Sequence, residues 1–307
     1  MNELQSTNQV LMIRPIRFAG NEQTAASNRF QNLNEQNNAQ AQALLEFDAL
    51  VIHLRAAGVA VHLLDDTPEP HTPDSIFPNN WVSFHTDGTV VLYPMLAPNR
   101  RLERRMDVLQ HLSAQGLRIA QTIDLSGHEA SNKFLEGTGS VVLDRVHRMA
   151  YACISPRTDL DVLGDFAQRL DYELVTFDAA DANGVPIYHT NVLLCIGTRF
   201  AVLCTEVIAA HEQAAVLHAL RSTGHEVIEI TAAQMQCFAG NMLELCTASG
   251  ATCVAMSHRA YESLNAMQRE RLQQLAGQLI VSPIPTIERL GGGSVRCMLA
   301  EVFLPRR

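Results

Sequence analysis

The stretch WVSFHTDGTVVLY (residues 81–93) has the pattern of a β-hairpin. Both halves are rich in β-branched and aromatic residues, which favour strands. The Asp87-Gly88 pair between them is a strong signal for a tight turn that joins two antiparallel strands. A helical pattern over residues 100–116 and a short β-rich run over residues 117–120 follow. The stretch therefore predicts a unit of the form ββαβ.

The same unit recurs along the chain at a spacing of roughly fifty-five residues, which lies within the range of propeller-like arrays. The further copies have hairpins at 140–154, 192–204 and 242–256, helices at 159–170, 208–224 and 259–277, and third strands at 172–177, 226–230 and 278–281.

The two chain ends supply the fifth copy. Residues 298–303 have no partner strand downstream, and residues 9–13 have none upstream. Pairing them completes a hairpin, and a helix over 41–58 and a strand over 59–63 complete the unit. Such a ring hides its sheet edges by closure. We therefore expect an α/β fold of five pseudo-symmetric ββαβ repeats, in which residues 1–307 form a single domain closed by the N- and C-terminal strands.

Composition limits the function classes. A net charge of −9 argues against a nucleic-acid-binding surface, and no apolar run approaches the ~18 residues of a membrane span. The first residues lack the basic and apolar regions of a signal peptide, so a cytoplasmic protein is expected. Seven cysteines without a CxxC pair or an HExxH motif favour reduced thiols over disulfides or zinc. We expect no metal, no cofactor, no nucleic-acid or membrane partner, and a small-molecule substrate; a homo-oligomer stays open.

The segments that precede the first strand of each repeat occupy equivalent positions, so we expect them to meet at the hub. They are residues 74–80, 135–139, 189–191, 238–241 and 293–297. The hub then collects Cys297, His189 and Glu136 together with several carboxamides. A cysteine nucleophile, a histidine proton shuttle and a carboxylate that orients the histidine are the groups that thiol-based catalysis uses.

The stretch GGGSVRCMLAE (residues 291–301) presents the thiol. Packing does not call for three consecutive glycines, whereas a loop that a ligand must approach closely does. We expect a loop that leads into a strand, with Cys297 at its mouth. The alternative is a flexible loop before an edge strand, with Cys297 as a small hydrophobic residue. His189 and Glu136 have similar alternatives, as an ordinary histidine and as a turn cap.

The chain resembles the pentein superfamily, which includes arginine deiminases, dimethylargininases, amidinotransferases and N-succinylarginine dihydrolase. The resemblance covers essentially the whole chain and is closest to the citrulline-utilisation hydrolases that are labelled arginine-deiminase-related. It is carried by LMIRP (11–15), PDSIFPNNW (73–81), LEGTGS (135–140) and residues 291–301. The resemblance implies a five-bladed propeller, with Cys297 as nucleophile, His189 as the catalytic histidine and Glu136 as its partner. It also implies that Arg157, within SPRT (155–158), binds the substrate α-carboxylate through a bidentate fork; the alternative is a surface charge.

The sequence departs from arginine deiminases where their two aspartates hold the cationic guanidinium. Asn80 and Asn191 stand there instead. A carboxamide can donate to the carbonyl oxygen of a ureido group, which a carboxylate would repel. We therefore include Asn80 and Asn191 in the substrate-binding set. Asn21, near the N-terminal strand, and Asp74, which opens the first hub segment, join the same set.

These observations predict a thiol-dependent hydrolase of a ureido or guanidino C–N bond. The first choice of reaction is citrulline to ornithine, ammonia and carbon dioxide through a covalent Cys297 intermediate. An arginine deiminase or dihydrolase is the nearest alternative, and an amidinotransferase is a further one. A different class is a non-catalytic pentein such as the ribosome anti-association factor, against which the complete Cys–His–Glu set argues.

Overall fold

The computed structural model describes residues 3–25, 27–33 and 38–307, and within these ranges the strands form five three-stranded sheets. In each sheet an antiparallel pair is joined by a third strand that runs parallel to the middle one. Four sheets use consecutive strands: β3 Val82–Phe84, β4 Thr89–Leu92 and β5 Gln121–Asp124; β6 Val142–Asp144, β7 Met149–Cys153 and β8 Glu173–Phe177; β9 Leu194–Ile196, β10 Phe200–Leu203 and β11 Glu226–Glu229; β12 Leu243–Cys246, β13 Thr252–Ser257 and β14 Gln278–Ser282.

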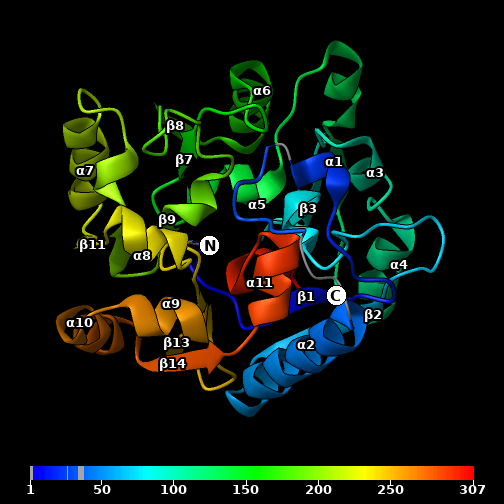
Figure 1. Ribbon diagram of the computed structural model, residues 1–307. Helices are drawn as coiled ribbons and strands as arrows, with labels where there is room; N and C mark the ends of the chain where they lie inside the picture. Colours follow the sequence, from blue (N-terminus) through cyan, green and yellow to red (C-terminus); the bar gives the residue numbers. More distant parts are fainter. Residues whose placement is uncertain (1–2, 26, 34–37) are drawn as a thin grey trace.

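The fifth sheet joins the two chain ends, as predicted. β1 Gln9–Arg14 pairs antiparallel with β15 Ala300–Glu301, with Leu11 opposite Ala300. β2 Ala60–Asp65 then runs parallel to β1. The five sheets surround a common centre, and the N-terminal label lies close to it (Figure 1). This arrangement is an α/β fold of repeated ββαβ units.

Each third strand is preceded by at least one helix, and the longer helices lie on the outside of the molecule (Figure 1). The longer helices are α2 Ala39–Ala56, α4 Met106–Ala114, α6 Leu160–Leu170, α7 Gln213–Ser222 and α10 Ala266–Ala276. The shorter ones are α1 Glu22–Ala25, α3 Pro98–Arg101, α5 Gly137–Ser140, α8 Ala232–Gln236, α9 His258–Ser263 and α11 Pro285–Gly291.

Hydrophobic residues fill the space between each sheet and its helix. In the first unit, Val10 and Met12 of β1 pack with Phe47, Leu50 and Leu54 of α2, and all five side chains are fully buried. One face of β1 is therefore covered by α2. Similar clusters join β4 with α4 and β7 with α6.

Several predicted elements differ in the structure. The helix expected over 100–116 is divided into α3 and α4, and the one expected over 259–277 into α9 and α10. In the second case, Asn265 caps a new helix through a hydrogen-bonded box with Gln268. The strand expected at 117–120 was wrong: Arg118 instead bonds to Pro305 of the C-terminal segment, and β5 begins at Gln121.

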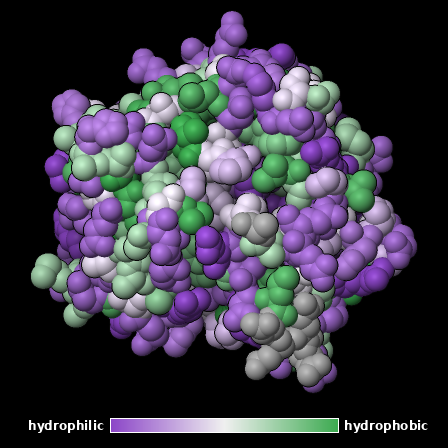
Figure 2. All heavy atoms as spheres, turned by 45° about the horizontal axis from the view of Figure 1, so that its top comes forward, coloured by the Kyte–Doolittle hydropathy of each residue, from purple (hydrophilic) through white to green (hydrophobic). Residues whose placement is uncertain are grey.

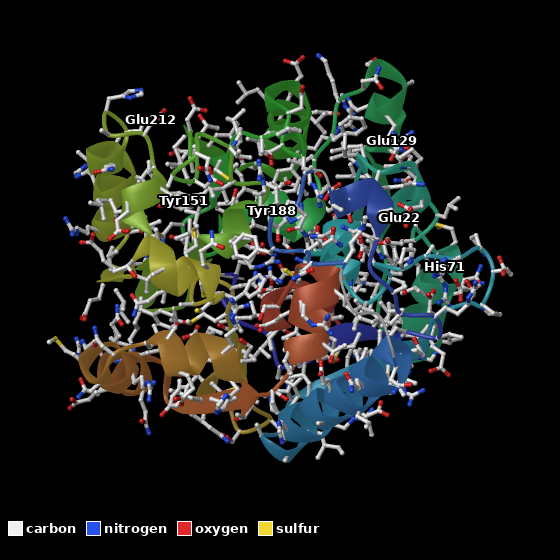
Figure 3. The ribbon with its side chains drawn as sticks, in the orientation of Figure 1. Glu22, His71, Glu129, Tyr151, Tyr188 and Glu212 are labelled. Atoms are coloured by element: carbon white, nitrogen blue, oxygen red, sulfur yellow. The ribbon has the colours of Figure 1, made fainter. Side chains whose placement is uncertain are left out.

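The hub segments meet at the centre, as predicted. η1 Pro78–Asn80, α5 Gly137–Ser140, η3 Thr190–Val192 and η5 Val295–Met298 are short helical turns that directly precede inner strands. α5 contacts both η1 and η3, and η1 contacts η5. Tyr188, beside η3, lies near the middle of the molecule, whereas Glu212, Glu129 and His71 lie at its periphery (Figure 3). The fold therefore brings residues of distant sequence to one point.

The face drawn in Figure 2 is mostly hydrophilic, with hydrophobic residues in separate groups. No helix within the described ranges is long and apolar enough to cross a membrane. All seven cysteines lie in those ranges and are free thiols.

The N-terminal segment ties neighbouring sheets together through Gln5. Its Nε2 donates to the carbonyls of Leu143 and Ile196 at 2.9 and 3.2 Å, and its Oε1 accepts from the N–H of Arg145 at 2.8 Å. One side chain therefore satisfies three backbone groups from two sheets.

We predict that Gln5→Ala lowers the free energy of unfolding by about 2–4 kcal/mol, because three buried backbone groups lose their partner. The measurement is urea unfolding followed by circular dichroism. Gln110→Ala on the exposed face of α4 is the control and should change stability by less than about 0.5 kcal/mol. Equal stability of the two variants would contradict the role assigned to Gln5.

Candidate active site

Residues from several hub segments line one buried cavity. Its lining includes Cys297, His189, Asn80, Arg157 and Asp74, all of which were predicted. Each of these side chains is at most 3% exposed. The remaining lining residues are Asn28, Phe77, Arg100, Tyr188, Gly291, Gly292 and Gly293.

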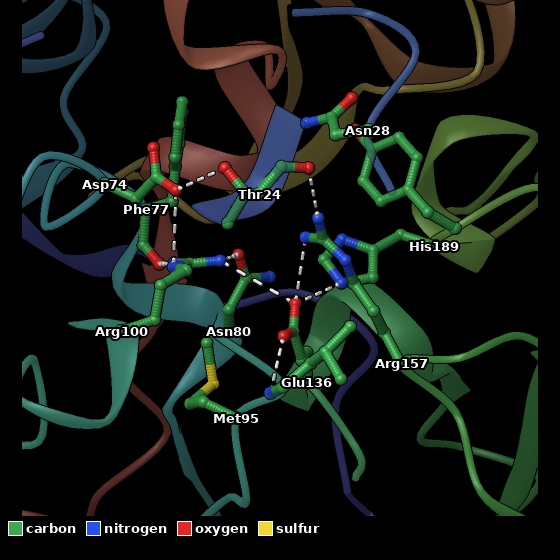
Figure 4. A network of polar contacts seen from close by, with 12 residues as sticks. Thr24, Asn28, Asp74, Phe77, Asn80, Met95, Arg100, Glu136, Arg157 and His189 are labelled. Carbon is green, nitrogen blue, oxygen red and sulfur yellow. Dashed lines mark hydrogen bonds and ion pairs between the residues drawn. The ribbon is translucent and has the colours of Figure 1, made fainter. Parts of the chain in front are cut away.

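Glu136 lies beneath the cavity as a fully buried carboxylate (Figure 4). Its Oε2 accepts from His189 Nε2 at 2.8 Å and from Arg157 Nη1 at 3.2 Å, and its Oε1 accepts from the Leu96 N–H at 3.1 Å. Burial would raise the pKa of Glu136, but Arg157 and the His189 hydrogen bond hold that pKa well below its usual range. The carboxylate is therefore ionised and able to orient His189.

His189 is neutral at physiological pH. Burial lowers its pKa to about 4, although the hydrogen bond to Glu136 acts in the opposite direction. Because Nε2 carries the hydrogen donated to Glu136, Nδ1 is the acceptor nitrogen of the ring. No described residue donates to Nδ1, so it is available as a base.

Two carboxamides face the thiol of Cys297. Its Sγ lies 3.3 Å from Asn241 Nδ2 and 3.7 Å from Asn191 Nδ2. The Asn241 amide is oriented by a second bond, since Nδ2 also donates to the backbone oxygen of Asn191 at 2.9 Å. Asn191 therefore lies against the nucleophile, and it is not among the residues that line the cavity.

The glycine stretch is organised differently from the prediction. Gly291 ends α11, Gly292 adopts a left-handed conformation with φ of 65°, and Cys297 lies in the short helix η5. The left-handed conformation explains the glycine at 292. The expectation that packing does not require glycines here was wrong, because a Cβ on Gly291 would lie 2.7 Å from the Phe77 ring.

A segment near the N-terminus covers this stretch. The Gly292 carbonyl accepts from Asn28 Nδ2 at 3.0 Å and from the Tyr188 hydroxyl at 2.7 Å. Arg157 Nη2 donates to the Thr24 carbonyl and the Ser27 hydroxyl, at 3.3 and 2.7 Å. Thr24, Ser27 and Asn28 thus contact either the glycine stretch or an arginine of the cavity.

Three buried polar atoms of the cavity residues have no hydrogen-bond partner among the described residues. They are Asp74 Oδ1, Asn80 Nδ2 and Arg157 Nε. A buried polar atom without a partner costs about 1–3 kcal/mol. One acceptor and two donors are therefore left for a ligand that carries both a cation and hydrogen-bond acceptors.

Asn21 lies behind the cavity lining. Its Nδ2 donates to Asp74 Oδ2 at 2.8 Å, and its Oδ1 accepts from Asn99 Nδ2 at 2.8 Å. The predicted binding residue therefore contacts Asp74, and it is not among the residues that line the cavity.

Sequence reasoning missed Arg100 and Asn241. Arg100 was included in a predicted helix, where a surface charge is the ordinary expectation, yet it is 2% exposed and lines the cavity. Asn241 belonged to a predicted hub segment, so its repeat position was the signal that could have identified it. Among the described residues, no group of three or more His, Cys, Asp or Glu side chains could hold a metal ion.

The lowered pKa of His189 predicts a pH effect on stability. In the unfolded chain the pKa of His189 is near 6.5, so the side chain binds a proton as the pH falls below that value. In the native chain its pKa is about 4, so it stays unprotonated down to that pH. The free energy of unfolding therefore decreases as the pH falls from 6.5 to 4. The native chain should lose about 3 kcal/mol more than His189→Gln between pH 7 and pH 4. Urea unfolding at several pH values measures this, with His71→Gln as an exposed control. If the free energy of unfolding depended on pH in the same way in the native chain and in His189→Gln, the lowered pKa assigned to His189 would be wrong.

Solved structures with a similar fold are found across almost the whole chain. ArgZ, an arginine dihydrolase from the ornithine-ammonia cycle in cyanobacteria, matches with a TM-score of 0.77 and 18% identity over 97% of this chain and 41% of its own. AgrE in complex with L-arginine matches with a TM-score of 0.76 and 19% identity, over 97% of this chain and 40% of that one. The chain thus spans about two fifths of both proteins.

A third similar structure is matched over almost all of its own chain. A dimethylarginine dimethylaminohydrolase with an S-methyl-L-thiocitrulline adduct matches with a TM-score of 0.66 and 15% identity, over 96% of this chain and 99% of its own. No curated protein matches the chain in sequence.

A protein-family model provides the assignment. The model described as N,N dimethylarginine dimethylhydrolase, eukaryotic, matches residues 14–304. The match spans both the central Cys297 and the segment that carries His189 and Glu136. It confirms the predicted resemblance and the predicted class, a hydrolase of guanidino-type C–N bonds. The chain therefore belongs to the N,N-dimethylarginine dimethylhydrolase family within the pentein superfamily of guanidino-group-modifying enzymes.

Proposed function

We propose that this protein is an arginine dihydrolase that converts arginine to ornithine, two molecules of ammonia and carbon dioxide. Citrulline, the substrate that the sequence favoured, is then the intermediate of the reaction. We further propose that residues 1–307 form one catalytic domain with the closed five-bladed pentein propeller.

The observation that carries this proposal is the set of unpartnered atoms on residues that line the same cavity as Cys297. Arg157 Nε can donate to an α-carboxylate, and Asp74 Oδ1 can accept from a cationic group. Asn80 Nδ2 can donate to an oxygen. An amino acid whose side-chain guanidinium is converted to a ureido group during the reaction can use all three atoms.

The charges around the cavity favour a cationic first substrate. Glu136, Glu103 and Asp74 are buried carboxyl groups, whereas Arg100 and Arg157 are the buried cations bound to them. Burial raises the pKa of Asp74, whose Oδ1 has no hydrogen-bond partner among the described residues. A guanidinium cation beside Asp74 would lower that pKa again, so an ionised Asp74 and a cationic substrate would stabilise each other. The named activities of ArgZ and the arginine complex of AgrE support the same choice.

The first half of the proposed reaction removes one ammonia. His189 Nδ1 takes the proton of Cys297, and the thiolate attacks the guanidinium carbon. His189 returns the proton to the departing nitrogen, the C–N bond breaks, and ammonia leaves an amidino group on sulfur. Water, deprotonated by His189, attacks that carbon, and the C–S bond breaks to give citrulline and the free thiol.

The second half repeats the chemistry on the ureido carbon. Cys297 attacks, a second ammonia leaves, and a thiocarbamoyl group remains on sulfur. Water then attacks, and the C–S bond breaks to release the carbamate of ornithine, which loses carbon dioxide. Throughout, Glu136 stabilises the imidazolium form of His189 and holds its ring in place.

We predict that the native chain releases ornithine and ammonia from arginine in a ratio near one to two. Cys297→Ser should lower the rate by at least about 1,000-fold, because a serine hydroxyl stays protonated where a thiol is easily deprotonated. Cys237→Ser, on a half-buried cysteine outside the cavity, is the matched control. Full ammonia release by Cys297→Ser would overturn the proposal.

The same assay separates the alternative functions. The family name favours N,N-dimethylarginine as a second candidate substrate, which would release dimethylamine and citrulline. An amidinotransferase would need an acceptor amine and release no ammonia. The substrate panel is therefore arginine, citrulline and dimethylarginine, each with and without glycine as an acceptor.

The contact between Asn241 and the thiol gives a further prediction. If Asn241 Nδ2 stabilises the thiolate, Asn241→Leu should slow alkylation of Cys297 at neutral pH about 10-fold, because hydrogen bonds to charged groups contribute about 1.5–3 kcal/mol. Alkylation by iodoacetamide, followed by mass spectrometry of the Cys297 peptide, measures this. Asn183→Ala in an exposed turn is the control. An unchanged rate in Asn241→Leu would show that the amide does not act on sulfur.

A further inference from the structure

We propose that Thr190 is a positioning residue, whose buried hydroxyl keeps the His189 ring bound to Glu136 during proton transfer. The hydroxyls of Ser140 and Ser155 complete the same support. The kinetic part of this inference rests on the proposed function, because it concerns the proton shuttle of that reaction.

The His189 ring has little direct support of its own. Among the described residues its side chain forms one hydrogen bond, from Nε2 to Glu136 at 2.8 Å, and it packs against the Tyr188 ring at a centroid distance of 4.7 Å. A proton shuttle has to lie within about 2.6–3.2 Å of the atom that gives or takes the proton. The backbone on either side of His189 therefore has to hold the ring in place.

The Thr190 hydroxyl fixes the backbone on one side. Its Oγ1 donates to the Ser140 carbonyl at 2.6 Å and accepts from the Cys153 N–H at 2.8 Å. Thr190 and Ser140 are completely buried. Cys153 ends β7, and Ser140 ends α5, the short helix that directly follows Glu136. One hydroxyl group therefore binds η3 both to the second sheet and to the helix beside Glu136.

Ser155 fixes the backbone on the other side of His189. Its Oγ donates to the Tyr188 carbonyl at 2.9 Å and accepts from the Arg157 N–H at 3.1 Å. Both neighbours of His189 in the chain are thus held by a hydroxyl group that bonds to, or belongs to, residues 153–155.

Ser140 connects the remaining two segments of the site. Its Oγ donates to the Arg157 carbonyl at 2.8 Å and accepts from the Glu136 N–H at 3.0 Å. Three hydroxyl groups therefore join the segments that carry His189, Glu136 and Arg157. A hydroxyl can donate one hydrogen bond and accept others, and each of the three does both.

Loss of the Thr190 hydroxyl should displace the His189 ring. The Cys153 N–H and the Ser140 carbonyl would both lose their partner, so η3 can no longer stay in its native position at no cost. A displacement of about 1 Å at a reacting group can lower a rate about 100-fold. Because His189 transfers protons and does not hold the amino-acid end of the substrate, kcat should change and KM should not.

The kinetic test uses Thr190→Val, which keeps nearly the same shape without the hydroxyl. The kcat for arginine should fall about 10- to 100-fold, while KM changes by less than about twofold. Thr190→Ser restores the hydroxyl and should restore most of the kcat.

Thr205→Val is the matched control. Thr205 begins the short helix η4 Thr205–Val207, as Thr190 begins η3, and its hydroxyl donates to Glu229 Oε2 at 3.0 Å outside the cavity. This variant also loses a side-chain hydrogen bond at the start of a short helix, so it should be destabilised but keep the native kcat.

A nuclear magnetic resonance measurement tests the position of the ring without any substrate. In the native chain the Nε2–H proton of His189 is bonded to a buried carboxylate, so it should give a sharp low-field signal that is absent in His189→Gln. Thr190→Val should broaden this signal by exchange with water, and Thr190→Ser should restore it. Ser155→Ala should broaden it as well, and it serves if Thr190→Val fails to fold.

The outcomes are distinguishable. An unchanged kcat and proton signal in Thr190→Val, or a loss that Thr190→Ser does not restore, would overturn the positioning role. An equal loss of kcat in Thr205→Val would also overturn it, because the effect would then be one of stability. If the native chain releases ammonia from no substrate, the proposed function fails, and the proton signal still decides whether Thr190 positions His189.

Discussion

The buried Glu136 carboxylate is the constraint on which the rest of the site depends. A charge with no exposure to water needs partners, and here they are a histidine, an arginine and a backbone N–H. These partners come from different repeats, so the carboxylate is satisfied only when the repeats meet correctly at the centre. The contacts that keep Glu136 ionised therefore form only when the repeats are correctly assembled.

Carboxylates and carboxamides have different partners around the cavity. The carboxylates bind cations of the protein itself: Glu136 holds Arg157, and Glu103 holds Arg100. The carboxamides instead face the reacting groups, with Asn241 and Asn191 at the thiol and Asn80 in the cavity. A neutral amide can serve both a charged and an uncharged reaction partner, as the proposed conversion of arginine through citrulline requires.

The repeat pattern made most of the fold predictable. Hairpins with clear turn signals, and the unpaired strands at the two ends, were sufficient to assign the five sheets and the hub. The position of β5 was not predictable, because the residues before it bond to the C-terminal segment, which lies far away in sequence. The break between α9 and α10 has a local signal, the capping box of Asn265 and Gln268, which the sequence analysis did not use. In the candidate site, Cys297, His189 and Glu136 were placed by repeat position, whereas Arg100 was only the first residue of a predicted helix and had no functional signal.

The contacts of Thr24, Ser27 and Asn28 have a kinetic consequence. These residues bond to Arg157 and to the Gly292 carbonyl, directly over a cavity whose lining is buried. A substrate can reach Arg157 Nε only after some of these bonds break. Association should therefore proceed at the rate of a local opening of the chain, well below the rate at which the amino acid diffuses to the surface.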